Sequence, residues 1–294
     1  MLGPSVSIQP GGKGANQAVA AARDGALVVM AGAVGRDDLA APATELLRAA
    51  NVDLSRVVAA DSGTGCAAIA VDPAGENAIV VGSGANFAVR HQQIEDSLLT
   101  PDTTLVLQME VPAEETAALI RRAHARGTRI VLNLAPAGAL PEDALRKATI
   151  LVANETETAW LASEARAPDA DGHGGNGAPA GDDAKSEHMA VSDASLLHQR
   201  FGVQVVRTLG AAGLELASAG GIVPIPAFRI APVDTTAAGD CFVGVLAAAL
   251  DRGAALPDAL RRASAAAALC CTRHGSQAAI PTATETDAFL ARHP

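Results

Sequence analysis

Residues 233–242 read VDTTAAGDCF and lead directly into the apolar run from Phe242 to Leu250. A polar turn followed by small residues predicts the start of a helix, where unpaired backbone N–H groups attract an anion. Asp240 lies where that anion would bind, and a carboxylate there is suited to accept a proton from an attacking hydroxyl. An ordinary helix N-cap in a loop before a helix explains the same spacing equally well.

A second glycine-rich segment, PGGKGANQ at residues 10–17, opens an alanine-rich helix. Lys13, Asn16 and Gln17 crowd its first turn, and one cation with two amides suits directional hydrogen bonds to sugar hydroxyls. The segment lacks the Lys-Ser or Lys-Thr of a P-loop and the G-x-G-x-x-G of a dinucleotide site. A loop rich in glycine before a good helix former accounts for the glycines but not for the polar cluster.

Two further motifs lie between these segments: NETE at residues 154–157 and TLGAAG at residues 208–213. The four motifs together resemble those of the ribokinase-like (PfkB-type) carbohydrate kinases, in the same order from residue 3 to the end. The string GGKGANQA at residues 11–18 is most similar to the branch of that family that phosphorylates ribose. The resemblance implies one kinase domain over residues 1–294, an α/β three-layer αβα sandwich with a mostly parallel central sheet and a small β lid.

Alternating apolar runs and alanine-rich helices independently predict a parallel sheet covered on both faces. The expected strands are 27–33, 104–108, 129–134, 150–152 and 203–208, and the clearest helices are 113–126 and 256–271. Residues 65–81 differ, because two short apolar runs flank the turn Asp-Pro-Ala-Gly at 72–75 and predict a hairpin. In the family this position resembles the lid. Since an isolated two-stranded hairpin is marginal in water, we expect a homodimer formed through it.

Composition separates one segment from the rest and limits the partners. Residues 165–190 are rich in Gly, Pro and Asp without apolar periodicity, which predicts a flexible loop. The formal net charge of −10 argues against nucleic acid or an anionic membrane as partner. The four cysteines lack zinc-ligand spacing, and no apolar run is long enough to span a bilayer. We therefore expect a cytoplasmic enzyme with reduced thiols.

The segment before Pro10 is shorter than the resemblance implies. Family members begin with a strand carrying an Asn-x-Asp pair and then a lid strand, whereas here only MLGPSVSIQ precedes Pro10. We expect the first central strand and a sugar-gripping aspartate to be missing, which exposes two sheet edges and an apolar seam. A sequence that starts late and a degraded paralogue both explain this, and the intact remaining motifs favour the first.

The resemblance also assigns residues to the sugar and nucleotide sites. The sugar-binding positions are Gly11, Gly12, Lys13, Gly14, Ala15, Asn16, Glu110 and Asp240. The ATP-binding positions are Asn154, Thr208, Leu209, Gly210, Ala211, Ala212, Gly213, Gly239, Asp240 and Ser264, where Ser264 replaces a larger polar residue against adenine. The anion hole comprises Ala237, Ala238 and Gly239, with Asp240 as the general base.

Two ions accompany these sites in the family. Mg²⁺ is expected to be held through Glu157 and water, together with ATP. A K⁺ activator is expected to bind oxygens of Asp234, Thr236, Cys270, Arg273, Gly275 and Ala279. Ala279 stands where a hydroxyl residue commonly completes the site, so we expect weaker K⁺ binding.

These residues predict ATP-dependent phosphorylation of the primary hydroxyl of D-ribose to ribose 5-phosphate. Two alternatives stay open. One is a kinase for another pentose, such as deoxyribose, or for a nucleoside. The other is an impaired, truncated paralogue that only binds nucleotide or sugar, which the intact Asp240 and Gly239 oppose.

Overall fold

The computed structural model describes residues 7–71, 77–166 and 192–293. Its largest sheet has the strand order β10-β9-β8-β7-β6-β5. Strands β5 to β8 are parallel, whereas β9 pairs antiparallel with both β8 and β10. The expected parallel sheet is thus confirmed over its central strands, and the antiparallel edge was not assigned from the sequence.

The elements follow one another with helices between the parallel strands. The strands are β1 (Val29–Val34), β2 (Asp53–Ala59), β3 (Cys66–Val71), β4 (Asn77–Gly82), β5 (Thr104–Leu107), β6 (Arg129–Asn133), β7 (Ile150–Asn154), β8 (Gln204–Thr208), β9 (Leu214–Ser218) and β10 (Gly221–Ile225). The α-helices are α1 (Lys13–Arg23), α2 (Ala40–Ala49), α3 (Ala113–Ala125), α4 (Glu142–Leu145), α5 (Glu155–Arg166), α6 (Asp193–Phe201), α7 (Ala238–Asp251), α8 (Leu256–Cys270) and α9 (Ala283–Arg292).

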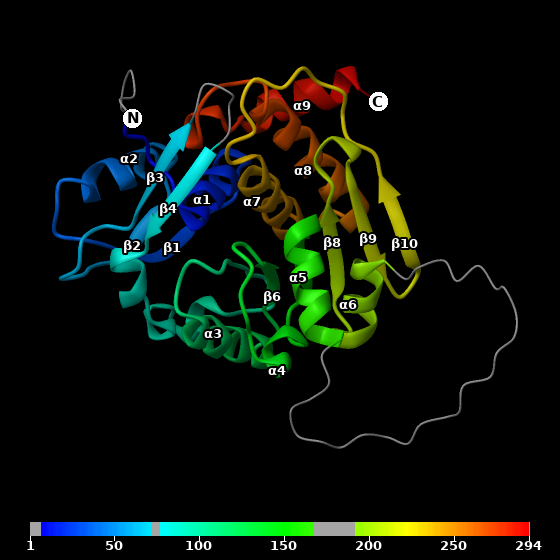
Figure 1. Cartoon of the computed structure of the whole chain (residues 1–294), viewed down its shortest axis with the longest axis horizontal. Coiled ribbons are helices and arrows are strands. Elements are labelled where there is room, and N and C mark those ends of the chain that lie inside the picture. Colours follow the sequence, from blue (N-terminus) through cyan, green and yellow to red (C-terminus); the bar gives the residue numbers. More distant parts are fainter. Residues whose placement is uncertain (1–6, 72–76, 167–191, 294) are drawn as a thin grey trace, which may run out of the picture.

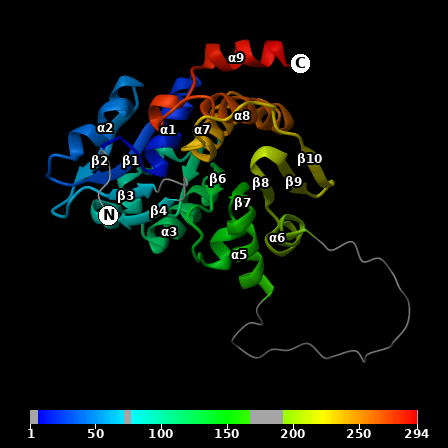
Figure 2. The same ribbon diagram turned by 45° about the horizontal axis from the view of Figure 1, so that its top comes forward.

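Helices cover both faces of this sheet, giving three layers (Figures 1 and 2). Alternate strand residues point to opposite faces, so neighbours along one strand enter different cores. Val131 and Val152 pack in the core with α1, α7 and α8. Leu132 and Leu151 pack in the core with α3 to α6. Burial on both faces explains why these strands are continuously apolar rather than alternating in polarity.

Strands β1 and β2 form a separate parallel two-stranded sheet. Within the described ranges no hydrogen-bonded ladder joins β1 to β5. The pair β1–β2 is therefore separate from the six-stranded sheet that ends at β5. Strands β3 and β4 form a third, antiparallel pair with Cys66 opposite Gly82. The predicted hairpin is therefore present, while its turn at 72–76 lies outside the described residues.

The predicted loop at 165–190 lies almost entirely outside the described residues, which omit 167–191. Its first two positions, Ala165 and Arg166, belong instead to the last turn of α5, because Ala and Arg are good helix formers. Among the residues that are described, no helix is long and apolar enough to cross a membrane.

Helices α1 and α7 make an unusually close contact, and they lie side by side in both views (Figures 1 and 2). A methyl group added at Gly244 of α7 would lie 2.3 Å from the backbone oxygen of Gln17 and 2.6 Å from Cβ of Ala20. Since Asp240 lies one turn before Gly244 on the same face of α7, it meets the preceding turn of α1. The small residues at this crossing thus place the two helix starts together.

We predict that Gly244→Ala destabilises the fold by about 1–3 kcal/mol, because the added methyl overpacks the helix crossing. This loss should appear even though alanine favours a helix over glycine by about 1 kcal/mol. Urea unfolding would measure it. Gly220→Ala is a matched control, since its added methyl meets only the Ser218 Oγ, at 3.8 Å. Equal stability of both variants would contradict the proposed packing constraint.

Candidate active site

The candidate site lies at the carboxyl ends of the parallel strands, where ligands bind in open α/β sheets. Glu110 follows β5, Asn133 ends β6 and Asn154 ends β7. Asn154 and Thr208 are direct register partners on β7 and β8. The folded chain therefore brings Asn154 and Thr208, from two of the motifs, to the same edge of the sheet as Glu110 and Asn133.

Asp240 lies in the first turn of α7 and is only 7% exposed. Its two carboxylate oxygens accept hydrogen bonds from α1: Oδ2 from Asn16 Nδ2 at 2.8 Å and Oδ1 from Gln17 Nε2 at 3.0 Å. Burial raises the pKa of Asp240, and this rise is partly opposed by Lys13 and by the two amides. A carboxylate with a raised pKa is better suited to take a proton near neutral pH.

Asn16 has one amide atom without a hydrogen-bond partner among the described residues. Its Nδ2 is used by Asp240, but its Oδ1 is buried and accepts no hydrogen bond from the described residues. A buried acceptor without a donor is costly, so such atoms mark a place for a ligand or water. A hydroxyl group bound here would lie beside the carboxylate of Asp240.

The residues expected to bind sugar surround the start of α1. Gly12 has φ of 88°, which lets the chain turn into the helix, and the Lys13 N–H donates to Glu110 Oε2 at 2.8 Å. A side chain at Gly14 would lie 3.1 Å from Gln108 Oε1. Burial raises the pKa of Glu110, and the backbone N–H and the charge of Lys13 partly oppose this rise. One helix N-terminus thus brings together these residues of the expected sugar site: Gly11, Gly12, Lys13, Gly14, Ala15, Asn16 and Glu110.

Lys13 supplies the positive charge at the centre of this site. Burial raises the pKa of three carboxyls from different elements, and the Lys13 ammonium group partly opposes that rise in Glu110, Glu157 and Asp240. One cation therefore acts on both the expected sugar side and the expected phosphate side. Such a group offsets the mutual repulsion of three acids in a partly buried space.

Asn154 and Glu157 form a reciprocal cap at the start of α5. The Glu157 N–H donates to Asn154 Oδ1 at 2.8 Å, and the Asn154 N–H donates to Glu157 Oε2 at 2.9 Å. Burial raises the pKa of Glu157, and the Asn154 N–H and Lys13 lower it. The cap fixes this carboxylate at the sheet edge.

The TLGAAG segment forms a turn after β8, with Gly210–Ala212 in one 3₁₀ turn. The Leu209 N–H donates to the Gly213 carbonyl at 2.8 Å, which closes the loop. Gly213 has φ of 101°, and an added methyl would lie 2.1 Å from the Ile225 oxygen. Only glycine fits there. Ser264 lies half-buried on α8, and no described hydrogen bond joins its side chain to this loop.

The turn before α7 has the backbone geometry of an anion site. Ala237 adopts a left-handed conformation with φ of 59°, unusual for a residue other than glycine. The Ala238 N–H donates to the Thr235 carbonyl at 3.2 Å, so it is engaged within the turn. The first-turn N–H groups of Gly239 and Asp240 have no carbonyl available within the helix. An added methyl at Gly239 meets no atom within 4 Å, so the space above it is open.

Asp234 joins two loops that the K⁺ assignment requires to be close. Its Oδ1 accepts from the Thr236 N–H and its Oδ2 from the Gly275 N–H, both at 2.9 Å. The thiol of Cys270 contacts the Thr236 carbonyl at 3.9 Å. Burial raises the pKa of Asp234, but the hydrogen bonds from Thr236 and Gly275 outweigh it, so the pKa is lowered overall. Arg273 is tied to Glu285 by its side chain.

The sequence analysis did not identify Gln108 and Asn133 at the carboxyl edge of the sheet, and it assigned Gln17 the wrong partner. Gln108 and Asn133 stand at the ends of β5 and β6, and both bond to Gln17. The expectation that Gln17 holds a sugar hydroxyl is wrong in this structure, because its side chain is buried between these residues and Asp240. Polar residues directly after an apolar strand were the available signal.

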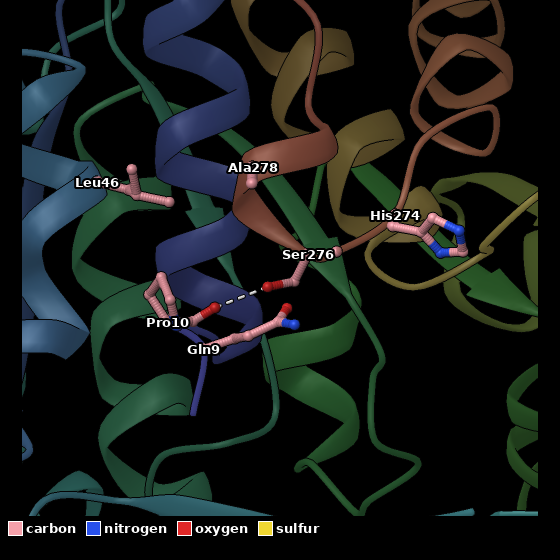
Figure 3. Close-up of a pocket in the computed structure, with 7 residues that line it drawn as sticks. Gln9, Pro10, Leu46, His274, Ser276 and Ala278 are labelled. Atoms are coloured by element: carbon pink, nitrogen blue, oxygen red, sulfur yellow. Dashed lines mark hydrogen bonds between the residues drawn. The ribbon is translucent and has the colours of Figure 1, made fainter. Parts of the chain in front are cut away.

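A cavity of about 170 Å³ lies beside the start of α1 and does not include Asp240 (Figure 3). Pro10, Leu46 and Ser276 are among its lining residues. The Ser276 hydroxyl donates to the Pro10 carbonyl at 2.7 Å. The cavity therefore flanks the candidate active site, and its wall connects the glycine-rich segment to the loop at 274–278.

Known proteins match this chain over nearly its whole length. The family model "pfkB family carbohydrate kinase" matches residues 1–283. A ribokinase from Haemophilus influenzae is 33% identical over 293 residues, covering 99% of this chain and 90% of that protein. A deoxyribokinase from Salmonella typhi is 29% identical over 291 residues, covering 98% and 89%.

A solved structure agrees with these sequence matches. The structure of Arabidopsis thaliana ribokinase complexed with ribose and ATP superposes with a TM-score of 0.83 and 25% identity, covering 99% of this chain and 90% of that one. Fold, motif geometry and sequence similarity lead to the same assignment: the chain belongs to the pfkB family of carbohydrate kinases.

Proposed function

We propose that this protein transfers the γ-phosphoryl group of ATP to the primary hydroxyl of D-ribose, forming ribose 5-phosphate and ADP. The observation that carries this is the unpaired, buried Asn16 Oδ1 beside the Asp240 carboxylate. One sugar hydroxyl donates a hydrogen bond to Asn16 Oδ1, and the neighbouring sugar hydroxyl can lose its proton to the Asp240 carboxylate. The similar proteins named ribokinase support ribose as the sugar. Because ATP is the donor, we propose the cytoplasm as the location.

In this mechanism the sugar is held by Lys13, Asn16 and Glu110 at the start of α1. Asp240 takes the proton of the attacking hydroxyl, whose oxygen forms a bond to the γ-phosphorus while the bond to the β-phosphate oxygen breaks. The N–H groups of Gly239 and Asp240, with the turn at Ala237 and Ala238, stabilise negative charge on the transferred group. Exclusion of water by the β3–β4 hairpin would limit ATP hydrolysis.

ATP is proposed to bind along Asn154 and the loop Thr208–Gly213, and the contact of Ser264 with adenine stays a prediction. Mg²⁺ would be held through Glu157 and water, and it neutralises charge on the ATP phosphates when bound. The described residues contain no cluster of three His, Cys, Asp or Glu side chains suited to a metal. A single carboxylate fits Mg²⁺, which usually keeps water and substrate phosphates as ligands.

A K⁺ ion is proposed to activate the enzyme from the loops joined by Asp234. Its ligands would be oxygens of Asp234 and Thr236 and carbonyls of Cys270, Arg273 and Gly275, with Ala279 offering no hydroxyl. In the same loop Gln277 is fully buried, and neither of its amide atoms has a partner in the described part of the chain. The unpaired Gln277 oxygen is the kind of neutral oxygen ligand that a hard cation binds.

A homodimer through the β3–β4 hairpin is proposed from its exposed apolar side chains. Val80 and Val81 are neighbours on β4 and are 72% and 63% exposed. Because neighbouring strand residues point to opposite faces, each face of this hairpin carries an exposed valine in the described part of β4. Ile69 and Phe87 add to the exposed apolar surface, which is typical of an interaction site.

The function is tested by measuring ADP release with D-ribose, 2-deoxyribose, other pentoses and nucleosides. We expect D-ribose to give the highest kcat/KM, and ³¹P NMR to place the phosphate on the primary hydroxyl. Asp240→Asn should retain ribose and ATP binding but lower kcat by at least about 10²-fold, the scale of general-base loss. A preference for deoxyribose would support the alternative that the deoxyribokinase relative suggests. Near-normal turnover of Asp240→Asn would remove Asp240 from the mechanism.

The cation proposal predicts higher activity when K⁺ replaces Na⁺ at constant ionic strength, with half-saturation at a relatively high concentration. Thermal unfolding without substrates should also shift upward in K⁺, since an ion that binds only the folded state stabilises it. Ala279→Ser should lower the K⁺ concentration needed for half the effect. Indifference to K⁺ in both measurements would end this assignment.

The dimer proposal predicts twice the chain mass for the wild type in light scattering. Val81→Lys should yield a monomer, because a charge cannot be buried unpaired in an apolar contact. Val223→Lys is the matched control, since Val223 is a strand valine on β10 that is 48% exposed. A monomeric wild type, or a dimeric Val81→Lys, would refute the contact.

A further inference from the structure

A chain of side-chain amides runs from the end of β5 to the Asp240 carboxylate. Gln108 Nε2 donates to Gln17 Oε1 at 2.6 Å. Gln17 Nε2 then donates to Asp240 Oδ1 and to Asn133 Oδ1, each at 3.0 Å. The Gln17 side chain is only 2% exposed, its amide oxygen accepts from Gln108, and its amide nitrogen donates to both Asn133 and Asp240. It therefore has no polar atom left for a substrate hydroxyl.

The Asn133 end of this chain fixes the direction of the Gln17 amide. Its oxygen must face Gln108, which donates, and its nitrogen must face Asn133, whose oxygen accepts. The Asn133 amide is itself set, because its Nδ2 donates to the Val152 carbonyl at 3.1 Å. A reversed Gln17 amide would place its oxygen against the Asn133 oxygen and the Asp240 carboxylate. Consequently Asp240 always meets a hydrogen-bond donor from Gln17.

Donors on both oxygens favour the ionised form of Asp240. Asn16 donates to Oδ2 and Gln17 to Oδ1, and each N–H bonds a carboxylate more strongly than a neutral acid. The charged groups around Asp240 are Lys13 of α1, Glu110 after β5 and Glu157 of α5, together with the Cys270 thiol of α8. The acids oppose ionisation of Asp240, and Lys13 supports it.

We propose that Gln17 is a positioning residue for the kinase reaction, which holds Asp240 ionised and oriented toward the substrate hydroxyl without contacting the sugar. This rests on the proposed function only in taking Asp240 as the base. The amide chain anchors Asp240 to the ends of two strands, β5 and β6, so the carboxylate is fixed relative to the sheet edge that binds substrate. Gln108 acts one step further away, by holding the Gln17 amide in its orientation.

The test is the pH dependence of kcat/KM in Gln17→Met, which keeps the side-chain length and removes the amide. Without the amide the Asp240 carboxylate can turn away from the attacking hydroxyl, so kcat should fall about 10–100-fold. The acid limb of the profile should move to higher pH, because the ionised base has lost a donor. The KM for the sugar should change less than about threefold. Gln17→Glu should move the limb further, since it adds a like charge.

Two variants keep the result interpretable. Gln93→Met removes another amide, which donates to the carbonyls of Gly32 at 2.9 Å and Arg56 at 2.8 Å, away from Asp240. It should leave the acid limb and kcat unchanged. If Gln17→Met does not fold, Gln108→Met replaces it, and its limb should move in the same direction by a smaller amount.

The outcomes separate this proposal from the proposed function. A raised sugar KM with an unmoved acid limb would show that Gln17 contacts the sugar, and would overturn its positioning role. The profile can be recorded with whichever sugar the wild type phosphorylates. A wild type inactive on ribose but active on another sugar therefore overturns only the substrate assignment.

Discussion

The close crossing of α1 and α7 at Gly244 is the contact on which the candidate site depends. Because Gly244 has no side chain and Ala20 only a methyl group, the helix N-termini lie together and Asn16 and Gln17 reach Asp240. Each helix start carries partial positive charge and unpaired N–H groups. Two such starts and Lys13 oppose the negative charge of Glu110, Glu157 and Asp240 at the sheet edge. This compensation of charge suits a carboxylate base and an incoming polyphosphate at the same time.

Much of this arrangement is predictable from local sequence. Apolar runs such as residues 129–134 and 203–208 indicate strands because burial on both faces leaves no polar alternation. The segment at 233–242 indicates a helix start that can bind an anion, and the structure gives Ala237 the left-handed turn that this requires. The hairpin at 65–81 follows from its turn residues. These features depend on neighbours in sequence, so local rules reach them.

The amide chain to Asp240 depends on contacts that local rules do not reach. Gln17 and Asp240 are 223 positions apart, and Gln17 and Gln108 are 91 apart. The crossing of α1 and α7 decides whether a polar residue in the first turn of α1 faces the ligand or the protein. Gly244 reads as an ordinary position in an apolar helix, and its role appears only when α1 packs against it. The antiparallel strands β9 and β10 escaped prediction because short antiparallel pairs carry weak periodicity.

The hydrogen bond from Ser276 to the Pro10 carbonyl makes one mechanical unit of two loops (Figure 3). Gly275, next to Ser276, binds Asp234, and Pro10 stands two residues before the turn at Gly12. A displacement of the loop at 274–278 therefore also displaces the segment at Pro10, and the reverse holds. Segments tied in this way open together rather than one at a time. The glycine-rich segment before α1 and the turn at residues 234–237 before α7 therefore share a single local stability.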